Sequence, residues 1–196
     1  MKKLILFFFA AVGAFAVNAQ DSGSSAPKTT TQSLNTNKYY DTLLPYRKNP
    51  NIPPFKLMQP DSTWFTNADL PKKKPVVIIY FSPECGHCQL AAQEISNSID
   101  KLKDATFIWV SYYSVPEIKT FTEKYKLTQY TNFRFGRDPQ YFLPTFFRVK
   151  FTPFMAVYDN NGQFVQAFEQ GAAPETLATL IHDNLHNKKP RKVKTT

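Results

Sequence analysis

The sequence predicts an α/β fold in which a central mixed β-sheet is flanked by helices. The first observation is a continuous apolar run at 76–81, which is typical of a central strand buried on both faces. The second is a stretch of helical apolar spacing after this run, followed by another apolar run at 107–110 and another such stretch. The third is a hairpin pattern near the C-terminus with a last amphipathic stretch behind it. Alternating strands and helices that end in a hairpin and a helix indicate one α/β domain.

Three stretches have the apolar spacing of amphipathic helices. The first is expected to run from the residues after the apolar run at 76–81 to about Lys103. Ser114 and Glu117 have the spacing of a capping box, so the second begins there. Pro174 opens the third. The apolar positions behind these predictions are Ala92, Ile95, Ile99 and Leu102, then Ile118, Phe121 and Tyr125, then Leu177, Ile181 and Leu185.

Short strands and turns complete the predicted domain. The segment 51–70 is expected to form an N-terminal β-hairpin and a short helix, with strands at 55–58 and 63–65. Residues 154–158 and 164–168 flank a turn that contains Asn161-Gly162, which is a strong hairpin signal. The segment 132–148 has no clear period. We expect a short helix or irregular segment there, around 140–147.

The N-terminus has the layout of a secretory signal peptide. Lys2 and Lys3 precede an apolar run at 4–17, and Val17-Asn18-Ala19 resembles an A-x-A cleavage site. A membrane-spanning helix needs about 18 or more apolar residues, so this shorter run favours cleavage near Ala19, with an uncleaved anchor as the alternative. We therefore expect a periplasmic or secreted protein.

Four segments are expected along the chain: a signal peptide at 1–19, a disordered linker at 20–38, one folded domain at 39–187 and a basic tail at 188–196. The linker is rich in Ser, Thr, Gln and Asn and has too little apolar surface to fold. The formal net charge of +9 becomes +7 when the two lysines of the signal peptide are removed. Much of the remaining positive charge lies in the basic tail and in Lys72-Lys73-Lys74. In an exported protein, this predicts at most weak contact with an anionic membrane surface and no nucleic-acid partner.

The chain has two cysteines, Cys85 and Cys88, which follow the buried strand and occupy the first turn of the predicted helix. Unpaired N–H groups and the helix dipole favour an anion there, so the pKa of Cys85 should be lowered and its thiolate should be nucleophilic. Cys88, one turn further along, is placed to resolve a mixed disulfide. A Cys-x-x-Cys motif between a strand and a helix predicts thiol–disulfide chemistry that needs no cofactor beyond the dithiol.

Other roles for the two cysteines are less well supported. A structural disulfide across so short a loop would constrain the unfolded chain little, and loss of redox function would not be expected to preserve both cysteines. A zinc site needs more ligands. His182 and His186 are four residues apart, like half of a zinc motif, but we expect them to be surface histidines and predict no metal site. A copper chaperone-like protein that binds a soft metal through Cys85 and Cys88 is the alternative function, although no third ligand has suitable spacing.

These residues resemble the thioredoxin superfamily. The segment 75–92 is similar to its active-site strand, motif and helix, with the Cys85-Gly86-His87-Cys88 motif of protein disulfide isomerases. Phe151-Thr152-Pro153-Phe154 resembles the segment that holds the family's cis-proline. The resemblance extends over about 53–185. The N-terminal hairpin and an insertion before Pro153 look like the redoxin (TlpA-like) branch that is exported to bacterial envelopes.

The resemblance implies that 39–187 is a thioredoxin-like domain. Its implied partners are protein thiol and disulfide substrates and a protein that donates or accepts electrons. The redoxin frame favours a reductase, whereas Gly86-His87 favours an oxidase or isomerase; we expect a reductase or a general exchange catalyst. The implied roles are nucleophile for Cys85, resolving thiol for Cys88, tuning of the dithiol for His87, cis-proline for Pro153, and substrate groove for Glu84, Gly86 and Thr152.

Two positions depart from the family's pattern. Thioredoxins have a buried acid six residues before the first cysteine, and this position is Ile79 here. The usual tryptophan before the first cysteine is Glu84, so we expect the proton of the resolving thiol to pass through water or Glu84, with slower exchange. Peroxiredoxin-type peroxidases need a Pro-x-x-x-Thr/Ser-x-x-Cys pattern. Ser82 fits it but Ile78 does not, so a peroxidase is not expected.

Overall fold

The computed structural model describes residues 44–186. The signal peptide expected at 1–19, the linker at 20–38 and the basic tail at 188–196 lie outside the described residues. Between residues 44 and 186, no helix has both the length and the apolar character needed to cross a membrane.

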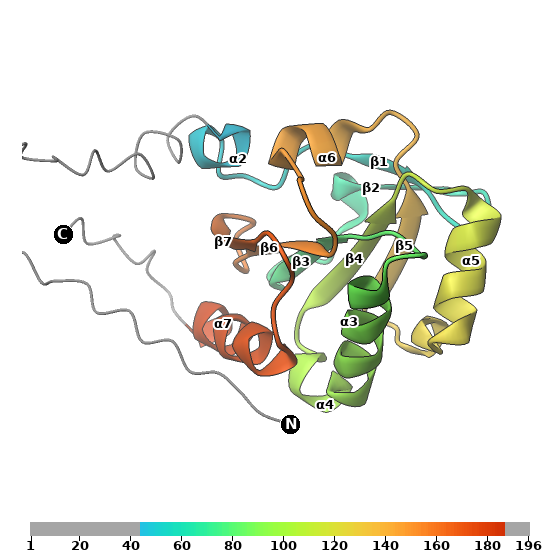
Figure 1. Cartoon of the computed structure of the whole chain (residues 1–196). Helices are drawn as coiled ribbons and strands as arrows, with labels where there is room; N and C mark the ends of the chain where they lie inside the picture. The colour runs from blue at the N-terminus through green and yellow to red at the C-terminus, as the bar shows by residue number, and fades with distance from the viewer. Residues whose placement is uncertain (1–43, 187–196) are drawn as a thin grey trace, which may run out of the picture. The chain divides into compact units, whose positions relative to one another are not determined.

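A seven-stranded mixed sheet forms the centre of the domain (Figure 1), in the order β2-β1-β5-β4-β3-β6-β7. The strands β3, β4 and β5 are parallel, and β6 runs antiparallel to β3. The sheet therefore confirms the predicted fold class. The strands are β1 (Lys56–Met58), β2 (Trp64–Thr66), β3 (Val76–Tyr80), β4 (Thr106–Ser111), β5 (Phe133–Arg137), β6 (Phe154–Tyr158) and β7 (Phe164–Phe168).

Helices cover both faces of the sheet. The helices α3 (Gly86–Asn97), α4 (Ile99–Leu102), α5 (Val115–Lys124) and α7 (Pro174–His186) contribute to one apolar cluster, whereas α2 (Pro45–Lys48) and α6 (Phe142–Phe147) contribute to the other. The crossovers from β3 to β4 and from β4 to β5 step across the sheet in the same direction. Right-handed crossovers of this kind place their helices on the same face, as observed for α3 and α5. Short 3₁₀ helices occur at Asn67–Asp69 and Leu127–Gln129.

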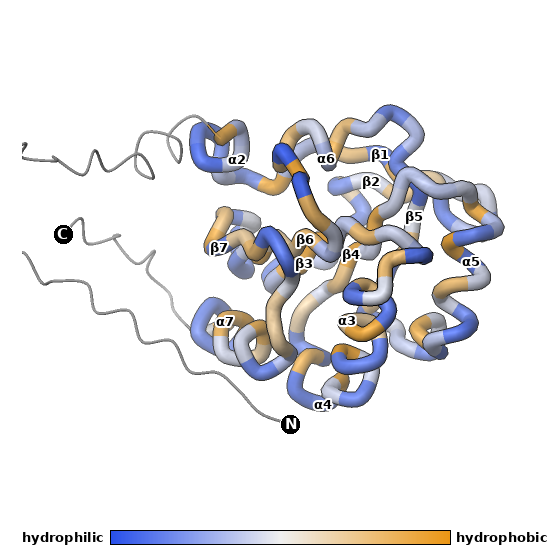
Figure 2. Tube along the Cα trace, viewed as in Figure 1, coloured by the Kyte–Doolittle hydropathy of each residue, from blue (hydrophilic) through white to orange (hydrophobic). Residues whose placement is uncertain are grey.

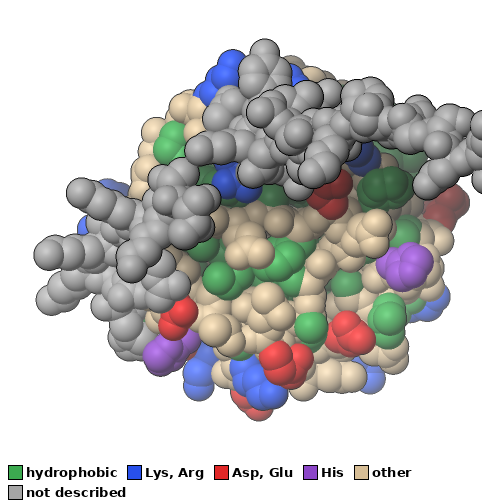
Figure 3. Space-filling model, turned by 60° about the vertical axis from the view of Figure 1, so that its left-hand side comes forward, with side chains coloured by type: hydrophobic (Ala, Val, Ile, Leu, Met, Phe, Trp, Pro, Cys, Tyr) green, Lys and Arg blue, Asp and Glu red, His purple; other side chains and the backbone are tan. Residues whose placement is uncertain are grey.

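The strand β3 is buried along its whole length, as its unbroken apolar sequence predicts. It pairs with β4 on one side and β6 on the other, and Ile79 lies opposite Trp109 and Met155. Figure 2 shows that hydrophobic positions concentrate along the central strands. On the surface in Figure 3, hydrophobic side chains gather near the middle of the view and most charged side chains lie towards its outer edge. A central strand this well enclosed is a rigid support for the segment that follows it.

Other local predictions are also confirmed. Both hairpins form, and Gly162 in the second turn has a φ of 74°, a conformation that favours glycine. The capping box at the start of α5 is present: the Ser114 backbone N–H donates to the Glu117 carboxylate at 2.8 Å, and Ser114 Oγ accepts from the Glu117 N–H at 3.5 Å. The short helix expected around 140–147 is α6, and the last predicted helix is α7.

Two expectations differ from the structure. The segment 132–148 contains the strand β5, which was not expected. Its apolar residues alternate with polar ones over Phe133-Arg134-Phe135 only, before Gly136, and this pattern is too short to predict a strand. A Cβ on Gly136 would lie 2.6 Å from the Cβ of Leu57, so glycine is required there for β1 to pack closely against β5. The helix expected to continue to about Lys103 is interrupted at Ser98, whose φ and ψ of −108° and 16° separate α3 from α4.

Candidate active site

The two cysteines lie between the end of β3 and the first turn of α3. Cys85 is the N-cap of α3, with extended backbone angles. Its N–H donates to the Ser82 carbonyl at 3.2 Å, and its carbonyl accepts from the Gln89 N–H at 3.0 Å. The Gln89 side chain also donates to the Pro83 carbonyl at 2.9 Å. These bonds fix the turn that connects the buried strand to the helix, so the position of Cys85 is set by the fold.

The two thiols differ in their exposure to solvent. Both are free cysteines; Cys85 is partly exposed, whereas Cys88 is fully buried in the apolar cluster under α3. The Cys85 thiol donates to the Thr152 carbonyl oxygen at an Sγ–O distance of 3.3 Å. A reagent or substrate in solution can therefore reach Cys85 but not Cys88.

The two thiols also differ in acidity, and the exposed thiol is the more acidic. Partial burial acts to raise the pKa of Cys85. Hydrogen bonding to the Thr152 side chain and to the backbone N–H groups of Cys88 and His87 outweighs burial, so the pKa of Cys85 lies below its ordinary value. The bond to the Thr152 carbonyl is available only to the protonated thiol, whereas the two N–H groups at the helix start stabilise the thiolate. Cys85 is therefore the more easily ionised thiol.

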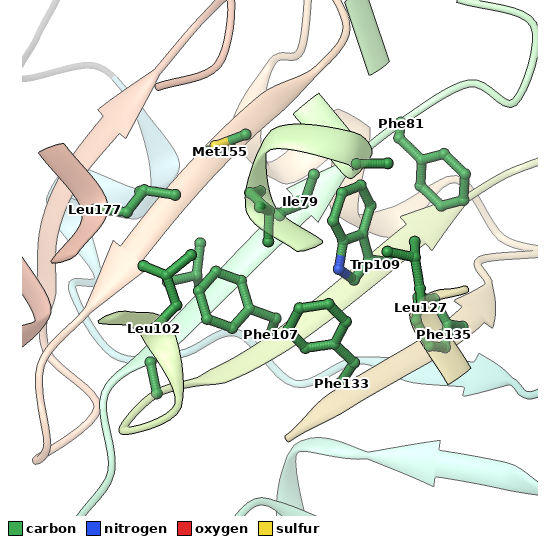
Figure 4. Packing of buried hydrophobic residues seen from close by; sticks show 14 of the residues in the cluster. Ile79, Phe81, Leu102, Phe107, Trp109, Leu127, Phe133, Phe135, Met155 and Leu177 are labelled. Atoms are coloured by element: carbon green, nitrogen blue, oxygen red, sulfur yellow. The ribbon is translucent and has the colours of Figure 1, made fainter. Parts of the chain in front are cut away.

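Burial raises the pKa of Cys88 to about 12, so this thiol stays protonated at neutral pH. The position that holds an acid in thioredoxins is occupied by Ile79, and Figure 4 shows this side chain within the apolar cluster between Met155 and Trp109. Asp138 is the one buried carboxyl group among residues 44–186, and it accepts hydrogen bonds from backbone N–H groups at the start of α6 instead. Deprotonation of Cys88 must use another acceptor.

The segment before β6 and the segment after β7 meet beside the dithiol. The Thr152–Pro153 peptide bond is cis. Gly171 has a φ of 81°, and a Cβ on it would lie 3.0 Å from Pro153 Cγ, so a larger residue would crowd the proline. A hollow of about 200 Å³ extends from Pro153 along the exposed side of α3, lined also by His87, Leu90 and Gly171. This hollow is a groove that could hold a peptide next to Cys85.

Glu84 points away from the dithiol groove towards a group of tyrosines. Its carboxylate accepts a hydrogen bond from the Tyr113 hydroxyl at 3.1 Å. The ring centroids of Tyr112 and Tyr113 are 4.5 Å apart, and those of Tyr112 and Tyr141 are 5.4 Å apart. The residue that replaces the usual tryptophan is thus connected to an aromatic cluster.

Exposed apolar side chains are concentrated around Cys85. Tyr112 follows β4 and Tyr141 follows β5, so both lie at the edge where the three parallel strands end and where Cys85 follows β3. Ligands of open α/β sheets commonly bind at this edge. Trp64, the remaining large hydrophobic side chain that is exposed between residues 44 and 186, lies opposite Met58, which pairs with Arg137 at the end of β5. It is therefore at the same edge of the sheet but on β2, four strands away from β3. We call the other exposed side chains of this kind the apolar rim: Leu90, Tyr112, Tyr141, Phe142 and Phe151.

The structure brings together most residues that the sequence suggested for the site. Cys85, Cys88 and Thr152 interact, and His87 shares the groove with Pro153. Gly86 is exposed, and apart from its chain neighbours and the nearby backbone of α3 no atom lies within 4 Å of where its Cβ would be, so packing does not require glycine there. Glu84 is adjacent in the chain but bonds to Tyr113.

Sequence reasoning missed the apolar rim and Gly171. The rim comes from four separate segments, and only the order of strands in the sheet brings them to one edge. A glycine directly after a predicted strand could have indicated a close backbone approach. No comparable local signal marks Tyr112 or Tyr141.

No metal centre is evident in the part of the chain that the structure describes, where no three His, Cys, Asp or Glu side chains are grouped so that they could hold an ion. The side chain of His182 is exposed, and its Nδ1 lies 4.0 Å from a carboxylate oxygen of Asp183. The side chain of His186 lies outside the described residues.

A mixed sheet with a Cys-x-x-Cys pair at the start of the helix behind its central strand defines a thioredoxin-like protein with a redox-active dithiol. The sequence matches the AhpC/TSA family over residues 49–182, and the chain belongs to this family. It is a redoxin with thiol–disulfide oxidoreductase activity. The predicted likeness to the thioredoxin superfamily is thereby confirmed.

Solved structures share this fold. The structure of dsbF from Mycobacterium tuberculosis, in mixed oxidised and reduced forms, has 22% sequence identity and a TM-score of 0.56, and the match covers 65% of this chain and 92% of that one. A secreted M. tuberculosis disulfide oxidoreductase homologous to E. coli DsbE has 21% identity and a TM-score of 0.55, with coverage of 65% and 94%. ScoI from Bradyrhizobium japonicum with copper bound has 20% identity and a TM-score of 0.53, with coverage of 67% and 98%. None of the curated proteins that were compared matches the chain.

Proposed function

We propose that this enzyme is exported and exchanges disulfides with envelope protein substrates through Cys85 and Cys88, as a reductase or general exchange catalyst. The observation that carries the proposal is the contrast between the two thiols: the reachable Cys85 has a lowered pKa, and the buried Cys88 has a raised one. In such a pair, one sulfur can attack a substrate while the other stays protonated until it resolves the mixed disulfide.

In the reducing direction, the Cys85 thiolate attacks one sulfur of a substrate disulfide. A mixed disulfide forms, the substrate's S–S bond breaks, and the released substrate thiolate takes up a proton. Cys88 then loses its proton and attacks Cys85 Sγ, which forms the Cys85–Cys88 disulfide and releases the second substrate thiolate. Two electrons pass to the substrate. Because no buried carboxylate lies near Cys88 and the Glu84 carboxylate is bonded to Tyr113, we propose that the proton of Cys88 leaves through water.

The apolar rim supports a protein as the substrate. Phe151, Tyr141 and Leu90 are each more than half exposed, at 55%, 52% and 51%. Exposed apolar residues grouped in one place commonly mark an interaction site. A small thiol or hydroperoxide would contact few of these side chains, whereas a polypeptide segment next to a substrate cysteine would cover several. The rim therefore favours apolar segments of proteins.

Export rests on the signal-peptide pattern at 1–19, and one of the structures that share the fold is of a secreted protein. The copper-handling alternative is not favoured, because no third ligand accompanies the two cysteines within residues 44–186. A peroxidase is not favoured either. Ile78, at the position that would require proline, lies within β3 and packs on the sheet face opposite Cys88.

Assays on one preparation test the class of activity. We expect the protein to catalyse reduction of insulin disulfides by dithiothreitol, to bind copper(I) too weakly to compete with a thiol chelator, and to consume hydrogen peroxide no faster than a Cys85→Ser variant. Tight copper(I) binding without insulin reduction would replace this proposal by the metal-handling alternative. Peroxide consumption that depends on Cys85 would replace it by a peroxidase.

A variant of the apolar rim tests the substrate class. In Tyr141→Ser/Phe151→Ser, we expect kcat/KM for insulin to fall about tenfold or more, since each aromatic contact at such a site contributes about 1 kcal/mol or more. The rate with oxidised glutathione should stay within about twofold, because a small disulfide does not reach the rim. The control is Trp64→Ser, which removes an exposed aromatic side chain on β2, four strands away from the β3 strand that Cys85 follows. Equal losses with insulin and glutathione would argue against a role of the rim in binding proteins.

A further inference from the structure

The end of the sheet opposite the dithiol has a basic surface. Two adjoining hollows of about 150 and 340 Å³ share Pro71 and Lys74 in their linings. All charged side chains among the described residues that line them are cationic. We call these residues the basic end: Lys72, Lys73, Lys74, Lys103 and Arg134.

The parallel strands explain why these cations lie together and away from the dithiol. Lys74 precedes β3, Lys103 precedes β4 and Arg134 lies at the start of β5, so all three belong to the edge where the parallel strands begin. Cys85 follows the opposite end of β3. At about 3.3 Å per residue, the five residues of β3 separate the two edges by roughly 16 Å.

The charges of the basic end are available to an external partner. The four lysines are exposed, and the ion pairs that the structure shows between residues 44 and 186 involve other residues. The Arg134 side chain is held in place by hydrogen bonds from Nη1 to the carbonyls of Thr131 and Phe133, at 2.9 and 2.7 Å. Exposed Asp104 follows Lys103 in the chain but does not line either hollow. Unpaired cations grouped in this way attract an anionic surface.

The C-terminal end of α7 lies beside the basic end. Asn160 lines the larger hollow, and its side-chain N–H₂ donates to the Leu185 carbonyl at the end of α7, at 3.4 Å. The sequence continues from α7 into the basic tail, which contains Lys188, Lys189, Arg191, Lys192 and Lys194. The end of α7 thus lies next to the hollow that contains the three consecutive lysines.

We propose that the basic end binds the anionic headgroups of a membrane surface and holds the enzyme with its dithiol facing away from the bilayer. Anionic lipids attract clustered Lys and Arg side chains, and each residue near the surface strengthens binding about fivefold. A broad cationic edge without an enclosing pocket fits a membrane better than a single small anion. The proposal does not depend on which disulfides the enzyme exchanges.

Vesicle binding tests this proposal with the full chain. Partition is measured into vesicles of phosphatidylcholine alone and of phosphatidylcholine mixed with phosphatidylglycerol. We expect Lys72→Ser/Lys73→Ser/Lys74→Ser to bind the anionic vesicles about a hundredfold more weakly than the wild type and Lys103→Ser about fivefold more weakly. Binding to neutral vesicles should be the same for the wild type and the variants. Any contribution of the apolar segment 4–17 to binding is present in all of these proteins and therefore cancels from the comparison. Added salt should weaken only the binding to anionic vesicles.

The matched control is Lys56→Ser/Lys119→Ser/Lys150→Ser, which lowers the net charge equally but changes exposed lysines outside the basic end. It should retain most of the binding to anionic vesicles. Equal weakening by the two triple variants would show that only net charge matters and would overturn the proposal. Equal binding of the wild type to neutral and anionic vesicles would also overturn the proposal. Binding to a DNA duplex but not to anionic vesicles would overturn it too, because the basic end would then bind a soluble polyanion.

Discussion

A Cys88→Ser variant is expected to accumulate covalent mixed disulfides with its protein substrates, whereas Cys85→Ser should accumulate almost none. Cys85 can reach a substrate and ionises readily, so it forms the mixed disulfide, and without Cys88 the intermediate cannot resolve. Cys88 alone is fully buried, and with a pKa of about 12 only about one molecule in 10⁵ is ionised at pH 7. The difference in trapped product should therefore exceed a hundredfold, measured by non-reducing gels and mass spectrometry of envelope extracts.

The double variant Cys85→Ser/Cys88→Ser gives the background of this experiment. Both single variants should remain folded, since serine is close to cysteine in size, although the hydroxyl at the buried position 88 will lower stability. Melting temperatures measured beforehand separate loss of reactivity from loss of fold. Equal trapping by the two single variants would contradict the assignment of Cys85 as the nucleophile.

A second large effect is expected at His87, as a fall in the reduction potential of His87→Pro. The backbone N–H of His87 is one of the groups that lower the pKa of Cys85, and we expect its imidazole to add positive charge near the sulfur. Both stabilise the reduced, thiolate form and do little for the disulfide. Proline removes both but is tolerated in the first turn of a helix. Loss of one charge-assisted hydrogen bond, about 1.5–3 kcal/mol, corresponds to a fall of about 30–60 mV.

His87→Ala separates the two contributions, because it removes the imidazole and keeps the N–H. We expect its potential to lie between those of the wild type and His87→Pro in equilibria with glutathione. The wild type should lie nearer to about −180 mV, as in protein disulfide isomerase, than to about −270 mV, as in thioredoxin. A wild-type potential at or below about −270 mV, or no fall in His87→Pro, would show that His87 does not tune this dithiol.

The parts of the fold that the sequence predicted are those with strong local patterns. The strand β3 has an uninterrupted apolar sequence, α5 has Ser114 and Glu117 at its start, and the last hairpin has Asn161-Gly162 in its turn. Each pattern has one favourable local structure, so one sequence is enough to predict it. The dithiol was predictable for the same reason, because its position between a strand and a helix is a local feature.

The features that were not predicted depend on contacts between distant segments. The strand β5 is stabilised by pairing with β4 and β1, and its Gly136 is needed because Leu57 lies against it. The apolar rim likewise exists because the sheet order places the ends of β3, β4 and β5 side by side. Neither contact has a signature in the sequence around these residues. The contrast in burial between Cys85 and Cys88 is also a property of the packed structure, although the order of their acidities follows from their positions in the helix.

The dependence of the reduction potential on pH is the most direct test of the different states of the two thiols. Below the pKa of Cys85, reduction takes up two protons with two electrons, so the potential falls by about 59 mV per pH unit; above it, one proton is taken up and the fall is about 30 mV. We predict one change of slope, at a pH below the ordinary thiol pKa of about 8.5, because the pKa of Cys85 is lowered. The slope of about 30 mV per pH unit should then persist beyond about pH 10, because Cys88 keeps its proton up to a pKa of about 12. A slope of about 59 mV that continues to about pH 9 would show that Cys85 is not acidified, and a slope that vanishes above about pH 9 would show that Cys88 ionises with it.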